Sequence, residues 1–164
     1  MAHRIIPATP TDYVAIRSVA HRTWPDTFAA ILSPAQIEYM LEMMYSETAI
    51  REQVAGGHVF HLLRVRDETI GYVSHQTDYL PGTTKIHKIY LLPANQGKGY
   101  GRVMIDHVEQ IARTADQSVL RLDVNYENEA IGFYEYLGFR KIERCNTDIG
   151  NGYLMEDWVM EKSL

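Results

Sequence analysis

A glycine-rich segment, residues 96–102, holds the pattern in this chain that points most directly to chemistry. It reads QGKGYGR and stands between an apolar run, residues 86–92, and a helical pattern, residues 103–115. Glycines let the backbone approach a ligand closely, and the first N–H groups of a helix have no partner within the helix. The helix dipole and the side chains of Lys98 and Arg102 add positive potential. The segment therefore predicts a binding site for a phosphate group.

Composition limits the kind of protein that carries this segment. The chain has 164 residues, of which 46% are hydrophobic and 23% charged, and its formal net charge is −5. This length favours one domain over residues 1–164 with a core of its own. An acidic chain disfavours nucleic acid as a partner and is compatible with a cationic substrate.

Cysteine usage and hydropathy give the expected compartment. Cys145 is the single cysteine, which excludes an internal disulfide and fits a reducing cytoplasm. No run has the length of a signal-peptide core or a transmembrane helix. We therefore expect a soluble, cytoplasmic protein with no membrane partner.

The elements that position the glycine segment start with helices. Thr9 and Asp12 have capping-box spacing around Pro10, and the helix that they start is expected to end at Trp24, because Pro25 disfavours helix at the residue before it. Two further helices are predicted after Ser33 and near Ser46, and the second closes at glycine. Their apolar faces comprise Ile37, Met40, Leu41 and Met44, then Ile50 and Val54.

The middle and end of the chain predict strands. Residues 59–65 and 70–76 read as an antiparallel hairpin, and residues 85–92 as a third strand that leads into the glycine segment. A strand at residues 119–124 follows the next helix, which predicts parallel pairing by a right-handed crossover. A short helix, 129–137, and two final strands, 139–144 and 153–161, complete the pattern. The order predicts an α/β chain with a mixed sheet and helices on both faces.

Two motifs together resemble a known family. Gln96, Gly99 and Gly101 match the acetyl-coenzyme A signature of the GNAT (Gcn5-related) N-acetyltransferases, and residues 130–139, AIGFYEYLGF, are similar to that family's second signature. The two motifs lie about 30 residues apart with a strand between them. The resemblance covers nearly the whole chain. It implies the GNAT fold, a mostly antiparallel sheet with one splayed parallel strand pair.

The resemblance also implies how acetyl-CoA is bound. Loop N–H groups would hold the pyrophosphate, the main chain of the preceding strand would bind the pantetheine arm, and Phe133 and Asn128 would lie near the coenzyme. The commonest family pattern has Asn at the position of Glu127, so Asn128 would have to serve instead. The implied coenzyme residues are Ile89, Tyr90, Leu91, Gln96, Gly97, Lys98, Gly99, Tyr100, Gly101, Arg102, Asn128 and Phe133.

The implied chemistry is direct acetyl transfer to an amine. Tyr134 falls at the family's general acid, which protonates the departing thiolate, and a tyrosine with a pKa of about 10 suits that task. Many relatives carry a glutamate base on the strand before the loop, where this chain has His87. A histidine that titrates near neutrality could take the amine proton directly, or a water chain could do so.

The acceptor site is expected near an aromatic segment between the first two helices. Residues 24–28, WPDTF, resemble the corresponding segment of bacterial spermidine/diamine acetyltransferases. An aromatic ring beside an acid suits an ammonium group, which predicts Trp24, Asp26, Phe28 and Tyr79 as substrate-binding residues, with Glu42 as an alternative acid. The implied substrate is a primary amine on a small cationic molecule such as a polyamine. The protein is expected to be a homodimer, as is common in the family.

Three other interpretations stay open. The acceptor could be a protein N-terminus or a lysine, or the chain could be a coenzyme-A-binding module with little catalysis. Most of the aromatic residues near the N-terminus could simply form the core. The seven histidines show no convincing metal-ligand spacing, so no metal is expected, and Cys145 lacks a neighbouring base that would make it a nucleophile.

Overall fold

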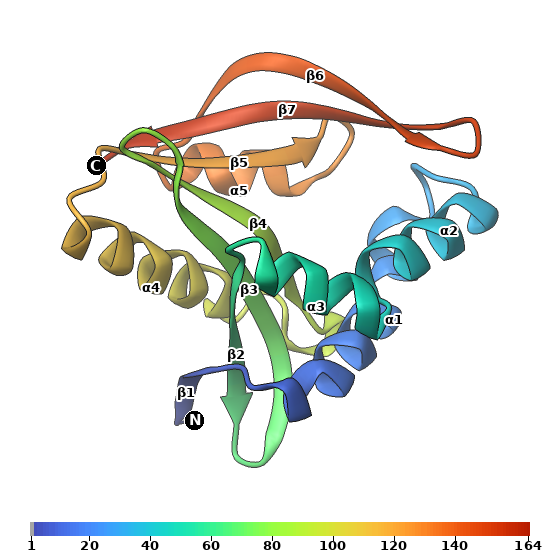
Figure 1. Ribbon diagram of the computed structural model, residues 1–164, viewed down its shortest axis with the longest axis horizontal. Helices are drawn as coiled ribbons and strands as arrows, with labels where there is room; N and C mark the ends of the chain where they lie inside the picture. Colours follow the sequence, from blue (N-terminus) through green and yellow to red (C-terminus); the bar gives the residue numbers. More distant parts are fainter. Residues whose placement is uncertain (1) are drawn as a thin grey trace.

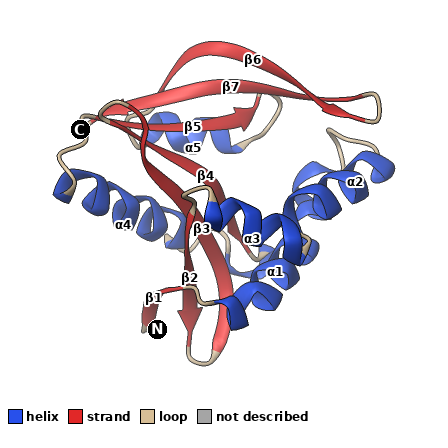
Figure 2. Ribbon diagram, viewed as in Figure 1, coloured by secondary structure: helices blue, strands red, loops and turns tan. Residues whose placement is uncertain are grey.

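The computed structural model describes residues 2–164 as a seven-stranded sheet with helices on both sides (Figures 1 and 2). The strand order is β1-β2-β3-β4-β5-β7-β6. The strands are β1 His3–Pro7, β2 Val59–Val65, β3 Glu68–Leu80, β4 Thr83–Leu91, β5 Val119–Asn125, β6 Arg140–Gly150 and β7 Tyr153–Ser163. The helices are α1 Tyr13–Phe28, α2 Pro34–Tyr45, α3 Glu47–Ala55, α4 Tyr100–Thr114 and α5 Ala130–Tyr136.

One parallel pair interrupts an otherwise antiparallel sheet. β4 and β5 pair from Thr83 opposite Val119 to Ile86 opposite Leu122, and β4 then continues to Leu91 with β3 as its strand partner. β5 likewise continues beside β7 alone. The two strands diverge from their paired ends, as Figure 1 shows. The predicted parallel pairing and its splaying are confirmed.

The two faces of the sheet are covered by different helices. On the face toward α1–α3, which we call the α1 face, Tyr72 lies opposite Tyr90, and both pack near Trp24 and Tyr45. On the other face, which we call the α4 face, the buried residues of α4 are apolar: Met104, Ile105, Val108 and Ala112. Burial of these apolar rows against the sheet is the main stabilising term for the fold.

The predicted end of the first helix at Trp24 is wrong. α1 runs through Pro25 to Phe28, so the segment expected between the first two helices is the last part of the first one. Proline in a helix interior costs about 3 kcal/mol. Trp24 and Phe28 are only 2% and 5% exposed, and full burial of each such side chain contributes about 1.5–3 kcal/mol. Packing of the two aromatic rings therefore offsets the missing backbone hydrogen bond.

Other predicted boundaries differ by a few residues. Ser33 and Ser46 do begin α2 and α3, since their side chains accept from the backbone N–H groups of Gln36 and Ala49. β3 and β6 run well past their predicted ends, whereas Val54, expected in the core, is 39% exposed. Among the helices within residues 2–164, none has both the length and the apolar character needed to cross a membrane.

Candidate active site

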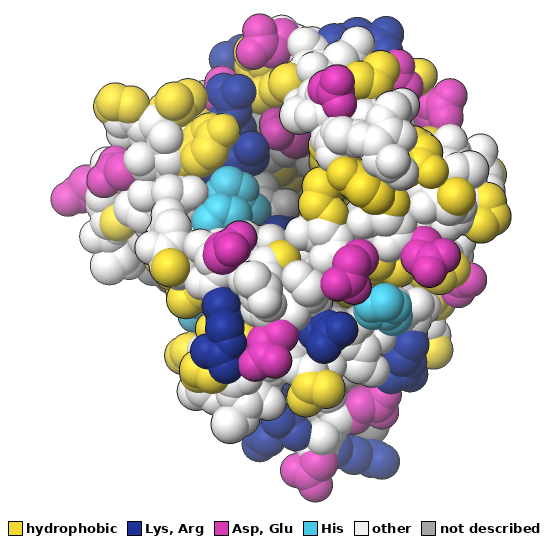
Figure 3. Space-filling model, turned by 45° about the vertical axis from the view of Figure 1, so that its right-hand side comes forward, with side chains coloured by type: hydrophobic (Ala, Val, Ile, Leu, Met, Phe, Trp, Pro, Cys, Tyr) yellow, Lys and Arg dark blue, Asp and Glu magenta, His cyan; other side chains and the backbone are white. Residues whose placement is uncertain are grey.

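A cavity of about 870 Å³ lies where β4 and β5 diverge. Its walls come from α1, α2, β4, the glycine loop, β5, α5 and β7. Figure 3 shows a hollow in the surface with histidine side chains on one wall and hydrophobic side chains on the other. One cavity thus reaches from the glycine loop to the end of α1.

The glycine loop has the shape expected of an anion site. Gly97 and Gly99 have φ angles of +77° and +87°, in the left-handed region that side chains rarely adopt. A Cβ atom on either residue would meet nothing within 4 Å, so the space over the loop is open. Gly99 is the N-cap of α4, which leaves the first N–H groups of this 15-residue helix without helical partners. The Gln96 side chain donates to the Leu91 carbonyl at 3.1 Å and ties the loop to β4.

Not every predicted loop residue reaches the cavity. Gln96, Gly97, Gly99, Gly101 and Arg102 line it. Lys98 and Tyr100 are not among the lining residues, and the Tyr100 ring packs edge-on against His3 with centroids 5.9 Å apart. The Arg102 Nε atom lies 3.8 Å from Asp106, so part of its charge is offset.

The second sequence motif places two aromatic residues on the cavity wall. Phe133 stands so close to Gly101 that a Cβ there would be 3.3 Å from its ring, which fits α5 against the start of α4. Tyr134 is 8% exposed and packs edge-on to Phe139 with centroids 5.9 Å apart. Burial raises the pKa of Tyr134 to about 12. Its hydroxyl therefore keeps its proton at neutral pH and can donate it.

The remaining predicted coenzyme residues also line the cavity. Ile89, Tyr90 and Leu91 lie on the part of β4 whose edge toward β5 has no strand partner. Asn128 is there too, but its side-chain oxygen accepts from the Ala130 N–H at 2.8 Å and so fixes the start of α5. The amide nitrogen of Asn128 and the second lone pair of its oxygen are left for a ligand.

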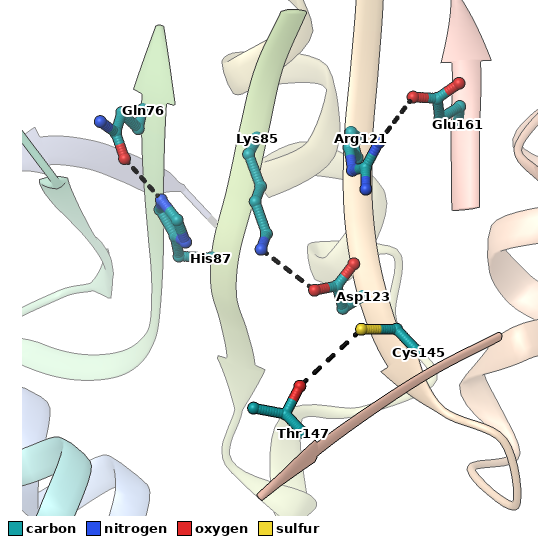
Figure 4. A network of polar contacts seen from close by, with 8 residues as sticks. All are labelled: Gln76, Lys85, His87, Arg121, Asp123, Cys145, Thr147 and Glu161. Atoms are coloured by element: carbon teal, nitrogen blue, oxygen red, sulfur yellow. Dashed lines mark hydrogen bonds and ion pairs between the residues drawn. The ribbon is translucent and has the colours of Figure 1, made fainter. Parts of the chain in front are cut away.

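His87 lies at an irregularity in β4. Ser74 pairs with Lys88 and His75 with Ile86, so His87 is the extra residue of a bulge, a device that re-aims side chains near active sites. Its Nε2 is 2.9 Å from the Gln76 side-chain oxygen (Figure 4), which can only accept. The Nε2 atom therefore carries the proton, and Nδ1 is the basic position.

The surroundings of His87 keep its ring neutral. His58 stacks on it with centroids 3.7 Å apart, and Tyr79 packs edge-on at 5.6 Å. Burial first, then the charges of His58 and Lys85, lower the pKa of His87 to about 3. The expectation of a histidine that titrates near neutrality is therefore not met.

The predicted acceptor residues divide into two groups. Trp24 and Phe28 are buried and Asp26 is exposed, and all three line the cavity. Tyr79 is not among the lining residues, but its ring lies 4.6 Å from the Lys85 ammonium and touches His87. Glu42 does not line the cavity either.

Three charged residues on β4, β5 and β7 were not predicted from the sequence. Lys85, Asp123 and Asp157 line the cavity, and the Lys85 ammonium pairs with Asp123 at 3.0 Å across the gap between β4 and β5 (Figure 4). Burial and the charge of Asp123 raise the pKa of Asp157 to about 6, against the opposing effect of Lys85. One signal was present. Asp157 alternates with Met155 and Val159 on a strand, and an acid in an otherwise apolar row needs a reason.

The structure also bears on metal binding. Within residues 2–164, no group of three or more histidine, cysteine, aspartate or glutamate side chains is arranged to hold a metal ion. His61, His75 and His107 do gather on the α4 face, but they pack ring against ring.

Comparison with known proteins decides the family. Residues 28–161 match the acetyltransferase (GNAT) domain family. The chain belongs to the GNAT family. An uncharacterised N-acetyltransferase of Lactobacillus delbrueckii subsp. lactis is 27% identical over 169 residues, which span 98% of this chain and 97% of that protein. The predicted GNAT family, fold and N-acetyltransferase activity are thus confirmed, and this GNAT protein is acetyl-CoA-dependent; the likeness to spermidine/diamine acetyltransferases stays a prediction.

Solved GNAT structures share the fold at low identity. The PaiA N-acetyltransferase from Thermoplasma acidophilum, in complex with coenzyme A, is 24% identical with a TM-score of 0.84, and the match covers all of both chains. The ribosomal-protein-S18-alanine N-acetyltransferase from Escherichia coli is 19% identical with a TM-score of 0.74, over 99% of this chain and 94% of that one. One fold thus serves proteins with different names, so it does not choose an acceptor.

Proposed function

We propose that this GNAT enzyme acetylates a primary amine of a small cationic molecule, with a polyamine as the first candidate. One observation carries the proposal: the cavity that the glycine loop lines continues to Trp24, Asp26 and Phe28. Aromatic rings beside a carboxylate suit an ammonium group, by cation–π attraction and ion pairing. The likeness of residues 24–28 to spermidine/diamine acetyltransferases supports the same acceptor.

In this proposal the residues of the glycine loop and β4 bind the coenzyme. The loop offers N–H groups at the start of α4, positive charge from Arg102 and, more remotely, Lys98, and open space that fits a pyrophosphate. The unpaired edge of β4 at Ile89, Tyr90 and Leu91 offers main-chain hydrogen bonds for the pantetheine arm. Phe133 and the amide of Asn128 would complete the surroundings of the coenzyme, and Tyr100 would contribute only its main-chain N–H at the start of α4. Bound acetyl-CoA supplies the acetyl group as a thioester.

The chain's own residues then provide charge stabilisation and proton transfer. Main-chain N–H groups of β4 that point into the cavity would stabilise the oxyanion that develops at the carbonyl. Tyr134, held protonated by burial, would donate a proton to the leaving thiolate. His87 stays a candidate for taking the amine proton, through Nδ1 or through water. Its pKa of about 3 makes it a poor match for an alkylammonium with a pKa of about 10.4.

Location and assembly stay predictions. The single cysteine fits a reducing cytoplasm, and a homodimer is common among GNAT enzymes. Tyr79 would reach the acceptor through its contacts with His87 and Lys85.

The test is release of free coenzyme A across polyamines, aminoglycosides, amino acids and N-terminal peptides. We expect the highest kcat/KM with a polyamine, and Asp26→Asn should raise the KM for it. A signal from peptides but not from polyamines would replace the small amine by a protein acceptor. Acetyl-CoA binding without turnover of any amine would indicate a non-catalytic module.

A further inference from the structure

One buried acid on the cavity wall has no partner in the fold. Asp157 is 8% exposed, yet among the hydrogen bonds and ion pairs formed within residues 2–164 none includes its carboxylate. Buried carboxylates are ordinarily paired, because removal of an ion from water costs several kcal/mol. Lys85 is the cation whose charge acts on Asp157, but its ammonium pairs with Asp123, so a cationic ligand in the cavity would be the partner that Asp157 lacks.

The charged residues around Asp157 leave one negative charge uncompensated. Asp157 lies opposite Asn125 and Asp123 opposite Val159, so the two acids are diagonal neighbours on one face of the sheet. The Lys85 ammonium pairs with Asp123 at 3.0 Å. The other titratable groups that face Asp157 are Tyr90 on β4 and Cys145, its register partner on β6. Neither is a cation, so two carboxylates share one ammonium.

We propose that Asp157 binds the ammonium group of the acceptor and accepts a proton from it before the amine attacks the thioester. The inference rests on the proposed function, because it names the residue that recognises a cationic amine in the cavity. Asp157 is then a catalytic residue. Asp123 and Lys85 are positioning residues, because their charges act on the Asp157 carboxylate.

The proton balance of the reaction is complete with this residue. The ammonium gives one proton to the Asp157 carboxylate and becomes a neutral amine. The nitrogen lone pair forms the bond to the acetyl carbon, and the carbonyl π electrons move to oxygen. When the oxyanion collapses, the C–S bond breaks, and the thiolate receives the proton from Tyr134. The amide nitrogen loses its second proton, which restores Tyr134 through water, and Asp157 releases its own proton to solvent.

Proton affinity also favours Asp157 over His87. Burial and Asp123 raise the pKa of Asp157 to about 6, whereas that of His87 is lowered to about 3. A group with a pKa near 6 is ionised at pH 7, so it attracts an ammonium, and it is a stronger base than an ordinary carboxylate. Asp157 therefore combines recognition and proton transfer in one group.

The test compares Asp157→Asn with Glu156→Gln. Glu156 is the adjacent acid on β7; its carboxylate bonds to the Tyr126 hydroxyl at 3.2 Å, and it is not among the lining residues. For the best amine in the coenzyme A release assay, Asp157→Asn should lower kcat/KM about 100-fold. Calorimetry without acetyl-CoA should show at least tenfold weaker binding of spermidine. Coenzyme A affinity should not change in either variant, which also shows that the variants fold, and Glu156→Gln should keep wild-type kinetics.

A pH profile separates this role from a structural one. Wild-type kcat/KM should fall below about pH 6 and level off above it. In Asp157→Asn, kcat/KM should not fall in this pH range. In Asp123→Asn the fall should occur at lower pH, because removal of a neighbouring negative charge makes Asp157 easier to ionise. The same fall of kcat/KM with decreasing pH in the wild type and both variants would overturn the proposal.

The remaining outcomes distinguish this inference from the proposed function. Normal turnover and normal spermidine binding by Asp157→Asn would sink the inference and leave the function intact. Spermidine binding that depends on Asp157, without turnover of any amine, would support the ammonium site and refute the function. If the wild-type protein binds no cationic amine at all, both are wrong.

Discussion

At the end of the cavity that we propose for the coenzyme, the coenzyme end, the chain offers backbone N–H groups and open space. At the end that we propose for the acceptor, the acceptor end, it offers side chains from α1 and from three strands. The first end depends on two glycines with positive φ and on the start of α4. The second depends on which residues the sheet register brings to one face, such as Asp123 and Asp157. A site made of backbone is shared by a family, and a site made of side chains distinguishes its members.

The largest effect on kcat is expected at Tyr134, between the two ends of the cavity. Tyr134→Phe removes the proton donor and keeps the ring, so kcat should fall about 100-fold. Coenzyme A affinity, measured by calorimetry, should not change. Tyr136 lies on the same helix and is 79% exposed, which makes Tyr136→Phe the control with wild-type kcat. An unchanged kcat in Tyr134→Phe would mean that the thiolate is protonated by another group.

The next effect tests the backbone end alone. Gly99→Val places a β-branched residue at φ +87° and fills the open space over the loop. Strain of this kind costs about 2 kcal/mol. If the loop relieves it by leaving its binding conformation, coenzyme A should bind about 30-fold more weakly. The matched variant is Gly152→Val in the β6–β7 turn, where φ is +79° and the space is also open. Gly152→Val should be less stable than the wild type and keep its affinity for coenzyme A. If both variants bind coenzyme A equally well, the loop does not hold the coenzyme.

A third measurement compares the histidines on the two faces of the sheet. Burial lowers the pKa of His61 to about 4 on the α4 face, beside His75 and His107. Its folded pKa lies below its unfolded value of 6.5, so the unfolded chain binds more protons between these pH values, and stability is lost as pH falls. Urea unfolding should show a loss on the order of 1 kcal/mol from His61 between pH 7 and pH 5.

The matching variant of that measurement is His61→Gln. It should flatten the pH dependence of unfolding, and coenzyme A affinity at pH 7 should stay the same, since His61 does not line the cavity. If the free energy of unfolding of His61→Gln falls as steeply with pH as that of the wild type, another group binds the proton. His58 and His87 on the α1 face are the next candidates.

The smallest effect concerns surface charge near the loop. Lys98 is exposed and is not among the lining residues, so Lys98→Ala should weaken coenzyme A binding only about threefold, as for other exposed ion pairs. The loss should shrink as salt is raised. A loss as large as that of Gly99→Val would mean that side-chain charge, and not the backbone, carries the binding.

The same contrast explains what could be predicted from the sequence. Glycine spacing, strand–loop–helix order and hydrophobic period are local, so the coenzyme end, the parallel strand pair and most helices follow from residues close together in the chain. The structure confirms the strand pair and most of the helices, and the family match confirms the family, whereas binding of coenzyme A by the loop stays a prediction.

The strand residues of the acceptor end could not be predicted in this way, although Trp24, Asp26 and Phe28 on α1 were. The diagonal placement of Asp123 and Asp157 depends on strand register across 34 positions of sequence. The bulge at His87 depends on a register shift between β3 and β4. The first helix was predicted to stop at Trp24 because a local rule for proline was applied where core packing prevails. A neutral, weakly basic His87 likewise follows from burial and from neighbours such as His58, which only the fold brings near.

The short pairing of β4 with β5 has a mechanical consequence. Only four residue pairs, from Thr83–Val119 to Ile86–Leu122, join the half-sheet β1–β4 to the half-sheet of β5, β7 and β6. A ligand that bridges the diverging strands would clamp the two half-sheets together. Its binding free energy would add to the stability of the whole chain, by about 2.7 kcal/mol at a hundredfold excess over Kd. The melting temperature of this enzyme would then report directly how much coenzyme it holds.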